Sequence, residues 1–297
     1  MNLCFTVFLR LLWILIRVKY CNITVSFSGA IDIPEIRNII GTLMNVQSKY
    51  NPKLSIITVV HNGEKYIERT ILSVTGQSYT NIEYLIIDGG STDGTVGIIK
   101  KYQKNIADWV SEKDQGIYDA MNKGLKRAKG HYVLFLNSGD ELYSGNTIES
   151  VFSQNDGSDV YYGETEIFNE KMKSMGGRRL KAPSDLNWKS FRFGMCVCHQ
   201  SFIIKRELAP FYNLKYKFVS DFDWMINGLK HVSKIHNTNL YLSKFMTGGV
   251  SRQNTIQSLW ERFSIMIYYY GMLTAALSHF VIAYKFIGFV TVHRKIN

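Results

Sequence analysis

The sequence predicts an α/β protein with a mostly parallel sheet flanked by helices, followed by an apolar helical tail. Short apolar runs of strand character alternate with segments in which apolar residues recur at helical spacing. The apolar runs lead into polar, turn-forming clusters. The 297 residues are 46% hydrophobic, which is enough to bury a sizeable core.

The alternation begins at residue 54. The expected elements are a strand at Leu54–Val60, a helix at Glu64–Val74, a strand at Ile82–Ile87, a helix at Thr95–Tyr102, a strand near Trp109–Ser111, a helix at Gly116–Lys129 and a strand at Tyr132–Leu136. The first strand is rich in β-branched residues, and the last is wholly apolar, as in a strand buried on both faces. Strands that alternate with helices indicate a parallel, doubly wound sheet with right-handed crossovers.

Polar clusters follow three of these strands, at Val60–Asn62, Asp88–Asp93 and Asn137–Asp140. The carboxyl ends of parallel strands meet at the edge where open α/β sheets bind ligands. Glycine-rich turns, helix N-termini and a carboxylate at that edge suit a diphosphate with a divalent metal. No P-loop motif occurs, and no G-x-G-x-x-G follows the first strand, so the pattern favours a nucleotide-sugar over nucleotide hydrolysis or dinucleotide redox chemistry.

Charge and the chain ends point to anionic partners. The net charge is +11, but no long Lys/Arg block or recognition motif suggests nucleic acid. Phe263–Tyr284 contains only His279 as an ionisable residue, which predicts membrane contact by a span or by a helix in the headgroup region. The alternative is a helix packed on the protein's own core. The apolar Asn2–Val18 is either an interfacial anchor or a start-site artefact.

Two segments carry a family resemblance. Residues 54–95, LSIITVVHNGEKYIERTILSVTGQSYTNIEYLIIDGGSTDGT, resemble the N-terminal half of family-two glycosyltransferases with the GT-A fold, which is Rossmann-like. Residues 111–142, SEKDQGIYDAMNKGLKRAKGHYVLFLNSGDEL, resemble the family's D-x-G-x-x-x-A-x-N-x-G helix and its acidic motif. Further along, His199-Gln200, Val219–Asp223 and Gly248–Ser251 are similar to bacterial polysaccharide-assembly members.

The sequence divides into four regions, and the resemblance, which does not include residues 1–52 or the C-terminal tail, implies a set of ligand contacts. The regions are an N-terminal apolar segment and connector (1–52), a nucleotide-sugar-binding half (53–145), an acceptor-binding half (146–255) and a membrane-associating tail (256–297). The implied contacts are Thr58, Val60 and Asn62 at the base and ribose, Asp88 accepting a base or ribose hydrogen bond, Lys113 and Asp114 beside the nucleotide, Asn137 at the sugar or ribose, His199 and Gln200 at the acceptor, and Arg252 over the donor phosphates. Asp93 either touches ligand or caps the next helix.

The acidic motif departs from the family's D-x-D-D pattern. Asn137-Ser138-Gly139-Asp140 leaves one aligned carboxylate. We therefore expect Asp140 to hold a divalent metal, magnesium or manganese, with Glu141 as a neighbour. A single carboxylate suffices because magnesium commonly completes its shell with substrate phosphates and waters.

The resemblance also implies inversion at the anomeric carbon, which needs a general base for the acceptor hydroxyl. Asp221 is the candidate, with Asp223 as the alternative, and Asp221 could at the same time cap its helix. A basic segment, Glu170–Arg192, could face the diphosphate of a lipid-linked acceptor through Arg178 and Arg179, or could be a solvated hairpin.

The predicted function is transfer of a sugar from a nucleotide-sugar, with UDP as the family's commonest carrier. The acceptor would be a lipid-linked glycan or oligosaccharide in bacterial surface polysaccharide synthesis, at the cytoplasmic face of the membrane. The alternatives are a protein or simple lipid acceptor, or a catalytically silent member that binds nucleotide or membrane. The sequence leaves the sugar, the linkage and the oligomeric state open.

Overall fold

The strands and helices expected between residues 54 and 136 are all present. The computed structural model describes residues 51–154, 157–247 and 254–293. The first part contains β1 (Leu54–Val60), α3 (Ile67–Thr75), β2 (Ile82–Asp88), α4 (Thr95–Lys101), β3 (Asp108–Ser111), α5 (Ile117–Arg127) and β4 (Tyr132–Phe135). Their ends lie within three residues of the predicted ones. The predictions for residues 1–50, for Gly248–Ser251 and for Arg252 lie outside the described residues.

The second part of the chain continues the same sheet. Its elements are β5 (Glu141–Leu142), α6 (Thr147–Ser153), β6 (Val160–Phe168), β7 (Ser174–Gly177), β8 (Phe202–Lys205), α7 (Ser220–Leu229), β9 (Ile235–Met246), α9 (Thr255–Tyr270) and α10 (Met272–His293), with 3₁₀ turns that include Trp188–Phe193 and His199–Ser201. The strand order is β3-β2-β1-β4-β8-β6-β9-β5, and β7 pairs with β6. One sheet therefore runs through both predicted halves of the transferase domain.

The parallel strands lie mainly at one side of the sheet. β3, β2, β1 and β4 are parallel neighbours, whereas β8 pairs antiparallel with β4 and with β6. Two successive antiparallel pairings restore the direction, so β6 runs parallel to β4 and its carboxyl end reaches the same edge. β9 also pairs parallel with β6.

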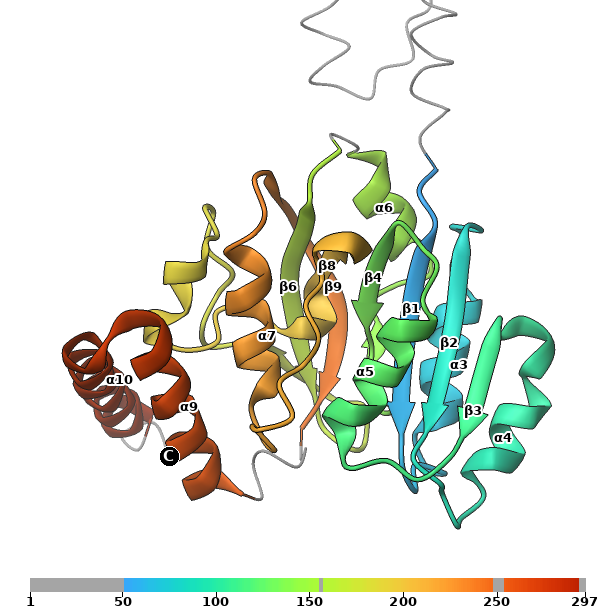
Figure 1. Cartoon of the computed structure of the whole chain (residues 1–297), viewed down its shortest axis with the longest axis horizontal. Helices are drawn as coiled ribbons and strands as arrows, with labels where there is room; N and C mark the ends of the chain where they lie inside the picture. Colours follow the sequence, from blue (N-terminus) through green and yellow to red (C-terminus); the bar gives the residue numbers. More distant parts are fainter. Residues whose placement is uncertain (1–50, 155–156, 248–253, 294–297) are drawn as a thin grey trace, which may run out of the picture. The chain divides into compact units, whose positions relative to one another are not determined.

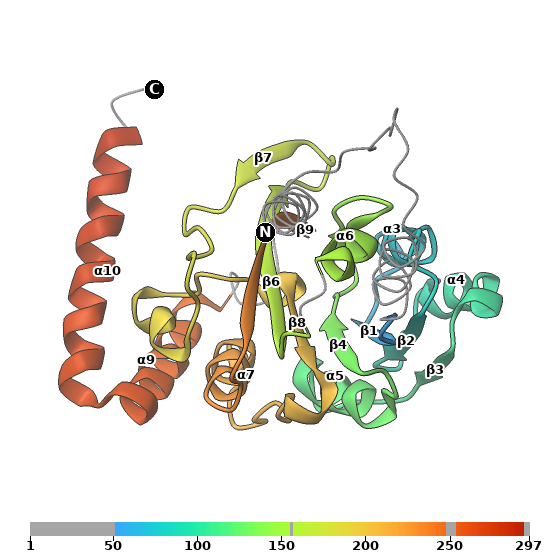
Figure 2. The same cartoon turned by 90° about the horizontal axis from the view of Figure 1, so that it is seen from above.

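Two hydrophobic layers cover the two faces of the sheet. On one face, Ile67 of α3 and Phe152 of α6 pack on Ile56 of β1. On the other face, Met121 of α5 and Trp224 of α7 lie in the core that contains residues of β1 and β4. Figure 2 shows the sheet between α3 and α6 on one side and α5 and α7 on the other.

The helices α9 and α10 lie beyond α7, at the side of the sheet away from β3 (Figure 1). α9 packs inward through Ile265 and Met266, and α10 through Ala275. Within the described residues, no helix combines the length and apolarity needed to cross a membrane.

Candidate active site

The strand register brings three strand ends to one edge, as predicted. Val60 pairs with Asp88, and Asp88 pairs with Ser111. The Ser138 N–H donates to the Val59 carbonyl at 3.2 Å, so the turn after β4 lies beside the end of β1.

Asp88 builds the turn that follows β2. Its carboxylate is buried and accepts hydrogen bonds from the N–H groups of Gly90 (3.2 Å) and Ser91 (3.0 Å) and from the hydroxyls of Ser91 and Ser111 (both 2.5 Å). Four donors fill a carboxylate's acceptor positions. A base or ribose donor at Asp88, which stays a prediction, would therefore displace one of these contacts.

The side chain of Thr58 does not reach the ligand edge. It is fully buried, on the face covered by α3, and its hydroxyl lies 3.1 Å from that of Tyr84. Val60, at the end of the strand, belongs to the same buried cluster. The expectation that Thr58 lines a base pocket is corrected by this orientation.

The turn after β1 is tied to the turn after β2. Asn62 is exposed, has a positive φ of 50°, and accepts the Thr92 N–H at 2.9 Å. Asp93 accepts the Thr95 N–H at 3.0 Å and the Glu64 N–H at 3.1 Å. The open question about Asp93 is therefore answered in favour of the helix start.

Lys113 and Asp114 lie at the same edge as these turns. Asp114 Oδ1 accepts the Gly116 N–H at 2.8 Å. A Cβ atom added to Gly89 would lie 2.4 Å from Asp114 Oδ2 and 3.4 Å from Nδ1 of His61, a residue that the sequence patterns did not single out. Backbone and carboxylate therefore approach closely here, which explains why glycine follows Asp88.

Asp140 is a buried carboxylate with neutral partners. Oδ2 accepts the Gln200 side-chain amide at 2.7 Å, and Oδ1 accepts the Met246 N–H at 3.1 Å. Burial raises the pKa of Asp140 to about 6, against the lowering effect of these hydrogen bonds and of His199. The residue before it, Gly139, has φ +99°.

The residues around Asp140 fit a divalent cation only as a site with one carboxylate. Glu141 lies between Arg69 (3.6 Å) and Lys244 (3.8 Å), and the described part of the chain contains no group of three or more His, Cys, Asp or Glu that could hold a metal. Asn137 Oδ1, in the same turn, is buried and accepts no hydrogen bond. An unpartnered oxygen beside a carboxylate suits magnesium or manganese completed by phosphate and water.

Asp221 is the centre of a polar chain that joins several of the predicted residues. Its Oδ2 lies 3.3 Å from His199 Nδ1, and its Oδ1 accepts the Tyr118 hydroxyl at 3.2 Å. His199 Nε2 in turn lies 3.3 Å from Asn137 Nδ2. Burial alone would raise the pKa of Asp221, but contact with His199 and the charge of Arg262 outweigh it and hold that pKa below its ordinary value.

Asp223 faces elsewhere. Burial raises its pKa, and its carboxylate accepts a hydrogen bond from the Tyr269 hydroxyl of α9. The N-cap of α7 is Val219, and α7 begins at Ser220, so Asp221 lies in the first turn and does not cap the helix as its sequence position suggested. Of the two candidate bases, the structure places Asp221 in the His199 network.

Several buried polar atoms without a hydrogen-bond partner occur on residues near Asp221 and in the turn after β4. Among the described residues they include Asn137 Oδ1, Ser138 Oγ, Arg178 Nη1, Tyr212 OH and Arg262 Nε. Tyr212 stacks on Tyr118, and Arg262 lies over the ring of Phe222, next to Asp221. Because buried polar groups in folded proteins nearly always have partners, such a cluster indicates a place where a polar ligand supplies them.

Tyr118, Glu261 and Arg262 are among the contributing residues that were missed from the sequence. Tyr118 lies within the quoted helix motif, but the motif carries no role for it. Glu261 and Arg262 immediately precede the apolar stretch that drew attention to the tail. The Glu261 carboxylate accepts the N–H groups of residues 217, 218 and 219 at 2.8, 2.9 and 3.3 Å, so α9 fixes the segment that leads to Asp221.

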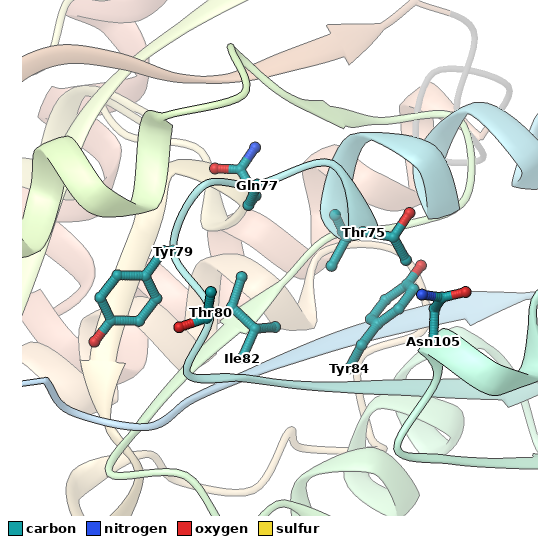
Figure 3. Close-up of a pocket in the computed structure, with 8 residues that line it drawn as sticks. Thr75, Gln77, Tyr79, Thr80, Ile82, Tyr84 and Asn105 are labelled. Carbon is teal, nitrogen blue, oxygen red and sulfur yellow. The ribbon is translucent and has the colours of Figure 1, made fainter.

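A separate hollow lies at the opposite edge of the sheet. It is lined by residues from the end of α3 to the start of β2, including Gln77, Tyr79 and Tyr84, and by Asn105 (Figure 3). Its described lining carries no acidic or basic side chain. Because β2 begins there and ends at Asp88, this hollow is distinct from the ligand edge.

The fold and this edge define a glycosyltransferase of the GT-A type, and comparison with known proteins identifies the family. The model of glycosyl transferase family 2 matches residues 55–209, and the chain belongs to that family. A PGL/p-HBAD biosynthesis glycosyltransferase of Mycobacterium tuberculosis is 31% identical over 185 residues, which cover 59% of this chain and 69% of the relative.

Two solved structures share the fold. Residues 1–349 of TarS of S. aureus, crystallised with UDP, align with a TM-score of 0.57 at 19% identity, over 72% of this chain and 65% of that crystallised chain. The mannosyltransferase PcManGT of Pyrobaculum calidifontis, in complex with GDP-Man and Mn²⁺, aligns with a TM-score of 0.52 at 15% identity, over 84% of this chain and 81% of PcManGT. These alignments confirm the predicted fold class, and the family membership confirms the predicted enzyme class.

Proposed function

We propose that this glycosyltransferase inverts the anomeric carbon of a nucleotide-sugar, with Asp221 as general base and a lipid-linked glycan or oligosaccharide as acceptor. The observation that carries the proposal is the polar chain Asn137–His199–Asp221–Tyr118, together with the unpartnered buried polar atoms on residues of this part of the fold. A sugar ring presents several hydroxyls, each of which donates and accepts, and so matches a site that offers both kinds of atom.

Asp221 has the properties of a base at neutral pH. Its pKa is held below the ordinary value, chiefly by His199 against the effect of burial, so it is a carboxylate that can take the acceptor hydroxyl's proton. Tyr118 and His199 fix its two oxygens and therefore orient it. The remaining polar atoms of the cluster would position the acceptor and the transferred sugar.

The nucleotide would lie across the turns that follow β1 and β2. Asn62, Lys113 and Asp114 are the side chains that would contact it. UDP is the proposed carrier, since TarS has been crystallised with UDP and with UDP-GlcNAc. PcManGT has been crystallised with GDP-Man, so GDP is the other carrier to test.

Asp140 would hold the divalent metal, and Asn137 Oδ1 is an unpartnered oxygen in the same turn. Mn²⁺ in the PcManGT complex supports this assignment. When bound, such a cation neutralises charge on the leaving diphosphate. Gln200 orients the Asp140 carboxylate through its 2.7 Å hydrogen bond.

The helices α9 and α10 would hold the enzyme at the cytoplasmic face of an anionic membrane. Trp260, Tyr268, Phe280 and Tyr284 are each at least 66% exposed on these helices. Large exposed apolar surface marks an interaction site, and a net charge of +11 favours anionic lipid. Cosedimentation with vesicles of phosphatidylglycerol should exceed that with phosphatidylcholine, and changing Phe280 to serine should reduce it.

The first test is binding and turnover with defined donors. In a thermal-shift screen of UDP and GDP with Mn²⁺, a ligand at 100 times its Kd should add about 2.7 kcal/mol to the free energy of unfolding. Release of nucleoside diphosphate from UDP- or GDP-sugars then distinguishes an enzyme from a silent binder. Asp221→Asn should keep nucleotide binding and lose turnover, and an unchanged turnover would contradict the assignment.

A further inference from the structure

Two arginines beside the Asp221 cluster have incomplete sets of partners. Arg178, directly after β7, donates through Nη2 to the Met195 carbonyl at 2.7 Å, while its Nη1 is buried without a partner. Arg262 lies 5.3 Å above the ring of Phe222, and its Nε is likewise buried without a partner.

Neither guanidinium group forms a direct ion pair within the described residues. Neither lies within 4.0 Å of a carboxylate oxygen, although the exposed Lys101 and the half-buried Lys205 do have such partners. Burial lowers the pKa of Arg262, the charge of Arg178 acts in the same direction, and Asp221 opposes both. Both side chains are half-buried, with one buried N–H group each that lacks a partner, so the arrangement is suited to a ligand that carries negative charge.

The arginine pair lies on the acceptor side of the sheet. β7 pairs with β6 at its carboxyl end, where Glu166 is opposite Gly177. From β2, which carries the nucleotide turn, the order β2-β1-β4-β8-β6 places β6 four strands away. At about 4.8 Å per strand, β6 lies about 19 Å from β2 with its nucleotide turn and about 10 Å from β4, whose turn carries Asp140. β6 and β7 form a hairpin, so the first part of the basic segment Glu170–Arg192 belongs to a hairpin.

We propose that Arg178 and Arg262 together bind a phosphate group of the acceptor. This inference rests on the proposed function and specifies the chemistry of its acceptor. Guanidinium groups present parallel N–H donors that match phosphate oxygens and form strong, charge-assisted hydrogen bonds. A phosphate there would satisfy Arg178 Nη1 and Arg262 Nε and would lie close to the base that receives the acceptor's proton.

The test uses the full chain and inorganic phosphate as the probe. Calorimetric titration is done with UDP and Mg²⁺ at saturation, so that the donor's own phosphate positions are filled. Phosphate should still bind, and Arg178→Gln and Arg262→Gln should each raise its Kd by about tenfold or more, as expected for loss of a charge-assisted contact. Lys171→Gln, which removes an exposed charge from the same basic segment, should leave that Kd unchanged.

The outcomes separate this inference from the proposed function. The Kd for UDP reports both the folding of each variant and its donor site, and it should equal the Kd of the parent. If a glutamine variant fails this check, Arg178→Lys or Arg262→Lys replaces it. Phosphate that binds only when UDP is absent would assign the arginines to the donor diphosphate and overturn the inference. Equal phosphate affinity in all variants, or an equal loss in Lys171→Gln, would also overturn it. Failure to bind UDP with intact phosphate binding would instead contradict the proposed donor.

Discussion

Replacing Asp140 with asparagine separates the free-energy cost of burying this carboxylate from its proposed role as a metal ligand. The pKa of Asp140 is raised from 3.8 to about 6 in the folded chain, mainly by burial. Folding therefore takes up a proton between these pH values, and the stability that Asp140 contributes is lost as the pH rises through about 6. At 1.36 kcal/mol per pKa unit, the carboxylate costs about 3 kcal/mol above that pH.

Asparagine can keep both hydrogen bonds of the site. Its oxygen can accept the Met246 N–H, and its amide can donate to Gln200 once that side chain turns its oxygen inward. We expect Asp140→Asn to match the parent near pH 4 and to exceed it by up to about 3 kcal/mol at pH 8. For a domain of this size the gain corresponds to about 2–4 °C in Tm per kcal/mol.

Thermal unfolding from pH 4 to pH 8, with and without UDP and Mn²⁺, measures this effect. The parent should gain stability from UDP with Mn²⁺, whereas Asp140→Asn should lose that gain because it lacks the charged ligand. Asp159→Asn is a control of opposite sign, since Lys205 lowers the pKa of Asp159 against burial, and its loss should destabilise at pH 8. A Tm for Asp140→Asn that lies below the parent by the same amount at every pH would refute the reasoning.

Three further substitutions test the rest of the site. Asp221→Asn should lower kcat by about 10²–10⁴-fold with an unchanged Kd for UDP, measured by diphosphate release and calorimetry. Glu261→Gln weakens the hydrogen bonds from three backbone N–H groups and should reduce kcat while the KM for the donor stays constant. A changed KM for the donor would instead indicate a general disturbance of the fold. Gly89→Ala places Cβ 2.4 Å from Asp114 Oδ2, an overlap that should cost about 1–3 kcal/mol and weaken UDP binding, whereas Gly97→Ala has open space and should be neutral or stabilising.

The sequence was most informative where the signal is local. The apolar run Leu54–Val60 predicts β1, and the turn residues Asp88–Asp93 predict the end of β2. Each signal lies within a few residues of the feature that it predicts. Because the carboxyl ends of parallel strands lie at one edge of a sheet, these strand ends predicted that the three turns meet there. The orientation of Thr58 did not, because β1 is buried on both faces and its sequence lacks the alternation that would assign a side chain to one face.

The residues that surround the base could not be found in the same way. The charge of Arg262 acts on Asp221 from α9, and Tyr212 stacks on Tyr118 from a loop. Tens of residues without a repeating pattern separate these positions in the sequence. Arg262 also stands beside a long apolar stretch, which dominated the interpretation of that part of the chain. The predicted contacts of Arg252 lie outside the described residues, and the donor and acceptor halves stay a prediction.

The two buried carboxylates of the site differ in their neighbours rather than in their burial. Asp140 has neutral hydrogen-bond donors, Gln200 and the Met246 N–H, and burial dominates its raised pKa. Asp221 has His199 and Arg262 nearby, and they hold its pKa down although burial acts on it as well. Carboxylates whose environments drive their pKa values apart serve different roles. Its neighbours stabilise the Asp221 carboxylate without any ligand, as the proposed base requires. Burial destabilises the Asp140 carboxylate, and a bound cation would offset that cost, as the proposed metal ligand requires.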